Sequence, residues 1–383
     1  MQLSEEQTAF YDMAKDFAVK KMAPNAEKWD EEKIFPIDTL RELAELGFGG
    51  IYVNPDLGGS GLSRLDSTLI FESLSHGCTS TAAFLSIHNM ANWMIDSFGS
   101  SELKESIVPD LCTMKKIASY CLTEAGAGSD AGNLKTKAIR DGDHYIVNGS
   151  KTWTTLAQNA DWIFCLVRTD NSGIKQEGIS FLLIDMKSPG IEVKPIITID
   201  GDHEVNTVFF SDVKVPAKNL IGEEGKGWTY AKFLLAHERF GIAAVGSSMR
   251  ELNRLKKIVN EIDNDDLRKK VSELEVSLSA LEITELRLLS ELENGGHPGA
   301  ESSILKIKGT EMQQKISELF VEASGEYALM YPGPHGYGSN DKPAGPDYAA
   351  NSLSAFLNLR KTSIYGGSNE IQKNILSKFV LGV

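Results

Sequence analysis

The hydrophobic pattern of this 383-residue chain changes its period twice, and this change restricts the possible folds more than any other feature. Residues 1–118 and 226–383 carry apolar residues three and four positions apart, which is the spacing of amphipathic helices. Residues 119–225 carry short β-branched and aromatic runs bounded by turn residues. We therefore predict an α+β multidomain chain with an N-terminal α-helical domain, a middle antiparallel β-sheet or barrel domain and a C-terminal α-helical bundle.

The middle domain should form an antiparallel rather than a parallel sheet. Its strand-like runs follow one another without helical segments between them, whereas parallel strands need a long crossover connection. Asp141-Gly142 lies between two such runs and is a strong signal for a tight hairpin. The pattern thus predicts consecutive strands joined by turns.

The two helical domains carry signals for individual helices. Ser4 is a suitable N-cap for a first amphipathic helix, with Val19 as the last residue of its apolar face. Ser368 should cap a final helix, and the segment 331–348 is too rich in Gly and Pro for regular structure. A stripe that only Glu285 interrupts predicts one long bundle helix. The stripe consists of Leu267, Val271, Leu274, Leu278, Leu281, Leu288 and Leu292.

Charge and hydropathy exclude several classes of partner. The net charge of −14 argues against nucleic acid and anionic membranes, although local basic residues can still hold a small polyanionic ligand. No apolar stretch approaches the roughly 20 residues that a membrane-spanning helix needs. The first residues read as an amphipathic helix rather than as a signal peptide. We therefore expect a cytoplasmic protein without membrane insertion.

Cysteine and histidine usage gives no sign of a metal site. The four cysteines lack metal-ligand spacing, and they are expected to be reduced and mostly buried thiols. The seven histidines are scattered and form no zinc-binding motif. We therefore expect no metal in this protein.

Two polar motifs in the middle domain are the candidates for ligand binding. They are YCLTEAGAGSD at residues 120–130 and KTWTT at residues 151–155. The first begins like a dinucleotide fingerprint, but it lacks the third glycine and opens no βαβ unit, which argues against a Rossmann dehydrogenase. Taken alone, a glycine-rich turn and a strand tryptophan can also be purely structural.

Together, in this order and within a helical–β–helical chain, the two motifs resemble the acyl-CoA dehydrogenase family over essentially the whole length. The family motif Y-C-x-T-E-P-G-A-G-S-D is matched with Ala125 in place of proline. Residues 1–118 resemble the isobutyryl-CoA dehydrogenase type, and the chain from about residue 145 onward resembles the large-subunit type of pimeloyl-CoA dehydrogenase.

The resemblance implies that FAD is held between the middle domain and the C-terminal bundle. Trp153 is implied to pack on the isoalloxazine, Thr155 to approach N5, and Ser129 to reach the cofactor or the thioester. Ser368 and Glu370 are implied to touch the adenosine half. The alternative for Trp153 is a half-buried strand aromatic. The implied cofactor contacts are Leu122, Thr123, Ser129, Trp153, Thr155, Ser368 and Glu370.

The catalytic base departs from the common family pattern. Many members place it in a Y-E-G-[ST] motif, but here Gly366 occupies the glutamate position. Members of the isovaleryl and long-chain types instead carry a glutamate before an arginine in a helix, which matches Glu238-Arg239. The resemblance implies Glu238 as the base, Arg239 at the substrate and the Gly366 N–H on the thioester carbonyl. Alternatively, Glu238 is a solvated or Arg-paired helix residue.

The implied reaction is the α,β-dehydrogenation of an acyl-CoA with a short or branched acyl group. The implied electron acceptor is an electron-transfer flavoprotein, and the implied assembly is a homotetramer or dimer. The R-x-x-F-G…Q element, which in relatives reaches the FAD of a neighbouring subunit, has no match around residues 250–272. Two alternatives stay open, a non-catalytic FAD- or acyl-CoA-binding subunit of a hetero-oligomer and an acyl-CoA oxidase.

Overall fold

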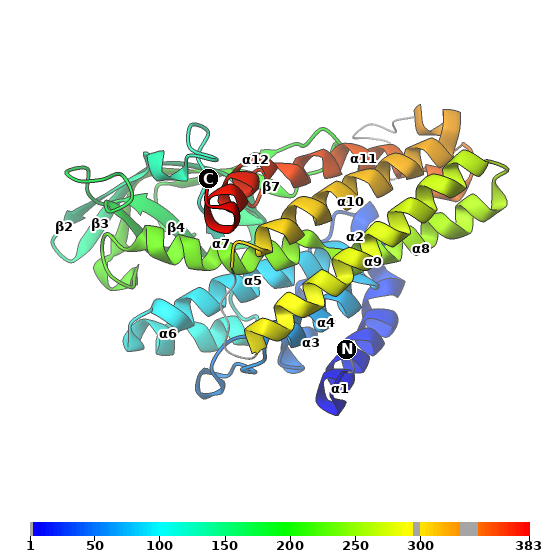
Figure 1. The fold of residues 1–383 in the computed structure, drawn as a ribbon. Helices are drawn as coiled ribbons and strands as arrows, with labels where there is room; N and C mark the ends of the chain where they lie inside the picture. Colours follow the sequence, from blue (N-terminus) through cyan, green and yellow to red (C-terminus); the bar gives the residue numbers. More distant parts are fainter. Residues whose placement is uncertain (1–2, 294–298, 330–343) are drawn as a thin grey trace.

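The computed structural model describes residues 3–293, 299–329 and 344–383. N-terminal helices, a middle sheet and C-terminal helices follow one another along the chain (Figure 1), so the predicted fold class is confirmed. The sheet lies at one end of the molecule and the long helices of the bundle extend toward the other. In the described residues, no helix is both long enough and apolar enough to cross a membrane.

The N-terminal part is helical, and its first helix begins where the sequence predicts. The Ser4 hydroxyl accepts a hydrogen bond from the backbone N–H of Gln7 in a capping box. Val19, however, is 59% exposed, so its prediction as part of the apolar face is wrong. A π-helical turn over Ala18–Met22 changes the residue spacing and buries Met22 instead. The helices are α1 (Glu5–Phe17), α2 (Ala23–Glu31), α3 (Ile37–Glu45), α4 (Arg64–Ser75), α5 (Thr79–Phe98) and α6 (Ser101–Cys112).

The middle part forms one mainly antiparallel sheet in the order β6-β7-β3-β2-β4-β5-β8. Asp141 pairs with His144 across the predicted hairpin. β1 and β4 pair in parallel because the β2–β3 hairpin lies between them in sequence and returns the chain to the same side. β2 also meets β4 in parallel at Lys137 and Arg168. The strands are β1 (Ala118–Cys121), β2 (Lys137–Asp141), β3 (His144–Thr155), β4 (Trp162–Arg168), β5 (Ile179–Asp185), β6 (Ile191–Ile196), β7 (Val205–Pro216) and β8 (Leu220–Ile221).

The C-terminal part is a helical bundle that contains the predicted long helix. Leu288 and Leu292 are only partly buried, and Leu289 takes the fully buried place at that end of the stripe. Ser368 caps the last α-helix as predicted. Most of the predicted loop 331–348 lies outside the described residues. The helices are α7 (Gly227–Ala243), α8 (Val245–Glu261), α9 (Asp265–Glu293), α10 (Ser302–Ser324), α11 (Ser352–Leu359) and α12 (Asn369–Leu376).

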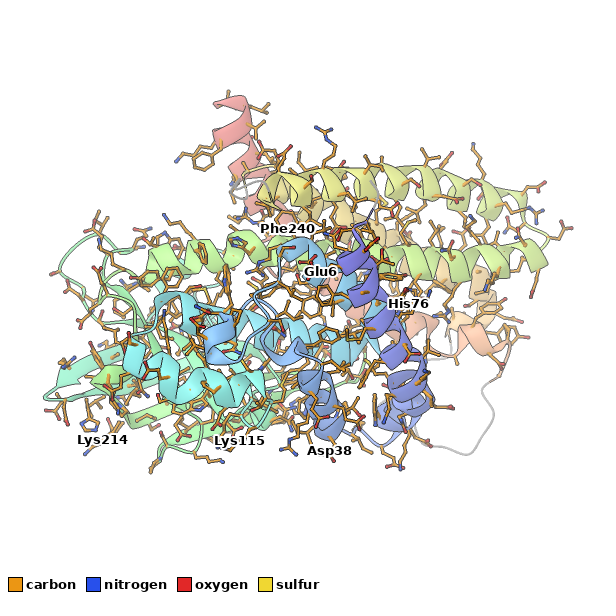
Figure 2. All side chains as sticks on the ribbon, turned by 90° about the horizontal axis from the view of Figure 1, so that it is seen from below. Glu6, Asp38, His76, Lys115, Lys214 and Phe240 are labelled. Carbon is orange, nitrogen blue, oxygen red and sulfur yellow. The ribbon has the colours of Figure 1, made fainter. Side chains whose placement is uncertain are left out.

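Helix α7 connects the sheet with the bundle. Figure 2 shows Phe240 of α7 in the middle of the molecule and Lys214 of β7 at one end. The first half of α7 packs in one apolar cluster with α5, β1 and β4, whereas Phe240 packs in the cluster of the bundle helices. A side chain in the second half of α7 can therefore contact all three parts of the chain.

All four cysteines are free thiols, as expected. Cys112, Cys121 and Cys165 are buried, and Cys78 is partly buried. They therefore behave as small apolar core residues.

Glu285 interrupts the apolar stripe of α9 and is buried, with 7% of its surface exposed. Burial, followed by the nearby carboxylates of Glu72 and Glu282, raises the pKa of Glu285 to about 8. Within the described residues, no hydrogen-bond donor reaches this carboxyl group. Glu285 is therefore protonated in the folded protein at neutral pH.

We predict that Glu285→Gln stabilises the protein increasingly as the pH rises above about 4.5, with the full gain reached above about pH 8. The folded-state pKa of about 8 lies above the ordinary value of 4.5, so the folded state binds the proton more tightly than the unfolded state does. Its stabilisation is complete below pH 4.5 and is lost as the pH rises through about 8. At pH 9 the variant should unfold with a free energy higher by about 2–4 kcal/mol, since one pKa unit corresponds to ~1.4 kcal/mol.

Urea unfolding of parent and variant at pH 5 and pH 9 measures this difference. Glu291→Gln, an exposed change on the same helix, is the matched control and should have no effect at either pH. An equal gain at both pH values would contradict the assignment, because the gain would then arise from packing.

Candidate functional site

Glu238 on α7 lies where the three parts of the chain meet. The Tyr120 hydroxyl of β1 donates a hydrogen bond of 2.6 Å to Glu238 Oε1. Burial raises the pKa of Glu238, while the hydrogen bond from Tyr120 and the charge of Arg239 act against this rise. A carboxylate whose pKa is shifted toward neutrality, with a fixed hydrogen-bond partner, is suited to accept a proton.

Arg239 points away from Glu238 toward the bundle. Its Nη1 lies 3.3 Å from the hydroxyl oxygen of Ser302 at the start of α10, and its Nε is buried without a partner. In the described chain, no ion pair joins Arg239 to Glu238. The alternative that Glu238 is simply an Arg-paired helix residue therefore finds no support. The predicted role of Arg239 at the substrate stays a prediction.

Gly366 lies opposite α7 in the turn before α12. Its φ of 63° and the φ of 80° at Gly367 favour glycine at both positions. A side chain at Gly366 would overlap the Cδ1 atom of Ile242 on α7. Within the described residues, no acceptor pairs with the Gly366 N–H. This N–H is therefore available to a ligand, and a side chain at this position would have to displace the end of the Ile242 side chain.

Tyr365 completes the surroundings of Glu238. Partial burial and the Glu238 charge raise the pKa of Tyr365 to about 12. Tyr365 therefore keeps its proton at neutral pH and adds no charge beside the carboxylate.

A buried ion pair fixes the first sequence motif against the second. Lys151 is fully buried, and its Nζ lies 2.9 Å from Glu124 Oε1 and 3.1 Å from the Leu122 carbonyl oxygen. The Glu124 carboxylate also accepts hydrogen bonds from the backbone N–H groups of Lys135 and Thr136. Although burial opposes it, the Lys151 charge and these N–H groups hold the pKa of Glu124 below its ordinary value.

The predicted cofactor residues Leu122 and Thr123 lie beside the KTWTT strand. The Thr123 carbonyl accepts a hydrogen bond of 2.9 Å from the Thr152 N–H. The Ser119 hydroxyl donates to the Thr155 carbonyl oxygen at 2.7 Å. The structure thus brings Leu122, Thr123 and Thr155 together at the ends of β1 and β3.

Trp153 has a backbone conformation that does not suit a structural strand tryptophan. Its φ is 63°, at an irregularity in the pairing of β3 with β7, and 56% of its side chain is exposed. A bulky residue in this conformation is strained, and such strain occurs at functional sites. The neighbouring Thr154 hydroxyl is buried without a partner. These observations favour a ligand-facing Trp153 over a half-buried strand aromatic.

The glycine-rich turn borders open space. A Cβ atom at Gly126 or Gly128 would meet no other atom within 4 Å, and Ser129 is exposed beside them. This open turn, the exposed Trp153 ring and the free Gly366 N–H fit a large, partly planar cofactor such as FAD.

Ser368 and Glu370 lie at the N-terminus of α12. The Ser368 hydroxyl accepts a hydrogen bond from the Ile371 N–H, and Glu370 is exposed in the first turn. Lys306 of α10 is fully buried and donates to Asn369 Oδ1 at 2.9 Å, which anchors this helix end. These contacts are structural, and contact with the adenosine half of FAD stays a prediction for both residues.

Sequence reasoning missed Tyr120, Lys151 and Ile242. The first two lie inside the motifs, where no role was assigned to them, and the third lies four residues after Glu238. Lys151 had the only local signal, because a lysine in an apolar strand needs a buried acidic partner. In the described residues, no group of His, Cys, Asp and Glu is arranged to hold a metal ion.

Consecutive segments of the chain match three domain models of one family. They are the N-terminal domain of acyl-CoA dehydrogenase over residues 4–115, its middle domain over residues 119–213 and its C-terminal domain over residues 225–381. The mitochondrial isobutyryl-CoA dehydrogenase of Bos taurus is 47% identical over 246 residues. That match covers 64% of this chain but only 59% of the relative, so it spans about three fifths of the relative's length.

Solved structures extend the similarity to the full chain. Butyryl-CoA dehydrogenase from Megasphaera elsdenii is 26% identical, with a TM-score of 0.83 and 98% of both chains covered. The FAD complex of PigA is 25% identical, with a TM-score of 0.88, 100% of this chain covered and 99% of the other. The matched domains in sequence and the shared fold show that this chain belongs to the acyl-CoA dehydrogenase family of flavin-dependent oxidoreductases, which use FAD.

Proposed function

We propose that this protein catalyses the FAD-dependent α,β-dehydrogenation of an acyl-CoA with a short or branched acyl group. Glu238 accepts the α-proton of the thioester, and the electron pair of that C–H bond forms the C=C bond. Bound FAD supplies the acceptor for the β-hydrogen, which leaves as hydride to N5. The observation that carries the proposal is the partly buried Glu238 carboxylate, held at the meeting point of β1, α7 and the turn at Gly366.

The surroundings of Gly366 support Glu238 as the base. Gly366 has no side chain, and the Cδ1 atom of Ile242 lies where the Cβ atom of a side chain at this position would be. Glu238 is one helical turn before Ile242, so the two side chains lie on the same face of α7. A base on α7 therefore replaces a base in the turn.

The α-proton of an isolated thioester is too weakly acidic for a carboxylate, so its carbonyl oxygen has to be polarised. The unpaired Gly366 N–H is suited to donate to that oxygen. A backbone donor needs no side chain, and the loss of the glutamate therefore does not remove it.

Stacked rings support a short acyl group. Trp93 of α5 stacks on Phe233 of α7 at 4.6 Å between ring centroids and lies 4.9 Å from the His237 ring. His237 directly precedes Glu238. Aromatic side chains thus fill the space between α5 and α7 next to the base. The names of the isobutyryl-CoA and butyryl-CoA relatives point to the same substrate class.

We further propose that electrons pass to an electron-transfer flavoprotein, that the protein is a homotetramer or dimer, and that it works in the cytoplasm. The domain limits 1–118, 119–225 and 226–383 are part of this proposal, and the starts of β1 at Ala118 and of α7 at Gly227, each within one residue of a limit, support them.

The first prediction for this function concerns Glu238→Gln. Anaerobic addition of butyryl-CoA or isobutyryl-CoA should bleach the flavin absorbance of the parent. The variant should be slower by about 10²–10⁴-fold, the range that positioned acid–base groups contribute. Glu261→Gln, an exposed change on α8, is the control and should leave the rate unchanged.

Three other outcomes would favour an alternative function or an alternative base. Flavin that no acyl-CoA reduces would indicate the non-catalytic subunit. Equal reduction in parent and Glu238→Gln would place the base on another residue. Rapid reoxidation of the reduced parent by air would indicate an acyl-CoA oxidase.

A second prediction concerns the space at Gly366. Gly366→Glu should not rescue the Glu238→Gln variant, because the φ of 63° disfavours a side chain and the end of the Ile242 side chain would have to move. Adding Ile242→Ala should recover part of the flavin-reduction rate, at least tenfold above Glu238→Gln alone. Rescue by Gly366→Glu without the Ile242 change would show that Ile242 does not exclude a base from the turn.

A third prediction concerns Lys151→Met. The change leaves Glu124 buried without its cation, and breaking such a pair costs roughly 3–5 kcal/mol. Because Lys151 also holds the Leu122 carbonyl, the variant should lose FAD at least tenfold more readily, as measured by fluorescence of released flavin. Lys137→Met on the neighbouring strand β2 is the exposed control. Unchanged FAD retention would show that the ion pair of Lys151 and Glu124 does not contribute to cofactor binding.

A further inference from the structure

Tyr120 contacts Glu238 from the strand that leads into the glycine-rich turn. The distance of 2.6 Å between the two oxygens lies in the range of hydrogen bonds from hydroxyl groups to ionised carboxylates. Both side chains are partly buried, and they are 118 residues apart in sequence. This contact therefore depends on the packing of β1 against α7.

The ionisable groups that interact electrostatically with Glu238 come from three elements. They are Tyr120 from β1, Arg239 from α7 itself and Tyr365 from the turn before α12. Within the described chain, only Tyr120 donates a hydrogen bond to the carboxylate. Burial and the Glu238 charge raise the pKa of Tyr120 well above its ordinary value, so its hydroxyl remains a donor across the working pH range.

We propose that Tyr120 is a positioning residue for the reaction, which holds Glu238 Oε1 and leaves Oε2 as the atom that accepts the α-proton. This inference rests on the proposed function of Glu238. The hydrogen bond favours the ionised carboxylate, because it weakens when Oε2 takes the proton. Without it, burial alone would leave more of the base protonated and unable to react.

The strand also relates the base to the cofactor-facing residues. Tyr120 of β1 and Leu122 just after it pack against the same apolar cluster, whereas Cys121 between them packs in another, so Tyr120 and Leu122 lie on the same side of the chain. Tyr120 is paired with Phe164 in the parallel β1–β4 ladder, which fixes its position along the sheet. Tyr120, which contacts the proposed base, is therefore only two residues before Leu122, the first of the predicted flavin contacts.

The test is the pH dependence of anaerobic flavin reduction in Tyr120→Phe. The acidic limb of the rate profile should move to higher pH by about one unit, which makes the variant about tenfold slower below both pKa values. Above the shifted limb the rate should return to within about threefold of the parent. Binding of the enoyl-CoA product, followed by flavin absorbance, should be unchanged, because Tyr120 acts through Glu238.

Tyr230→Phe is the matched control. Tyr230 lies on α7, and its hydroxyl accepts a hydrogen bond from the Glu223 N–H rather than contacting the carboxylate. This variant should keep the position of the acidic limb. If Tyr120→Phe does not retain FAD, Glu238→Asp gives the same test, because its shorter side chain loses Tyr120 and should shift the limb in the same direction.

An unshifted limb, or an equal loss of rate at every pH, would overturn the role of Tyr120. Failure of the proposed function is a different result, since Glu238→Gln would then reduce flavin as fast as the parent. A parent that reacts, a Glu238→Gln variant that does not and an unshifted Tyr120→Phe would reject only this inference.

Discussion

The burial of one carboxyl group on α7 is the constraint on which the site depends. Removing a carboxylate from water disfavours its charge, and this effect makes Glu238 a stronger base than an exposed glutamate. The same effect would neutralise the group if nothing opposed it. The hydrogen bond from Tyr120 and the charge of Arg239 oppose this neutralisation, because both favour the ionised carboxylate. The meeting of β1 with α7 therefore sets both the position and the ionisation of the group.

The residues at positions 238, 242 and 366 depend on one another. Gly366 offers a backbone N–H but no side chain, Ile242 fills the space in front of it, and Glu238 supplies the carboxylate from one helical turn earlier. A glutamate at position 366 would contact the end of the Ile242 side chain. It would also have to adopt a φ of 63°, a conformation that favours glycine. A base in the turn would therefore need a backbone conformation that favours glycine and a shift of the end of the Ile242 side chain.

The sequence allowed most of the fold to be predicted, because periodicity reports burial along each element. It failed where the backbone left the expected geometry, as at Val19 within the π-helical turn, and where distant strands met, as in the parallel pairing of β1 with β4. For the site, motif resemblance pointed to Glu238 and Trp153. It could not identify Tyr120 as the partner of Glu238, because that contact joins residues 118 positions apart and leaves no local pattern.

Glu285 and Glu238 are two similarly placed glutamates, of which only Glu238 is suited to take part in a reaction. Both interrupt apolar faces of bundle helices, and burial raises the pKa of both. Glu285 faces two other carboxylates and, within the described residues, meets no donor, so it is neutral at pH 7 and can only pack. Glu238 instead accepts a hydrogen bond from Tyr120 and is influenced by the positive charge of Arg239, and both favour its ionised form. Burial alone therefore does not make a base, and the neighbouring donor decides whether the carboxyl group can accept a proton.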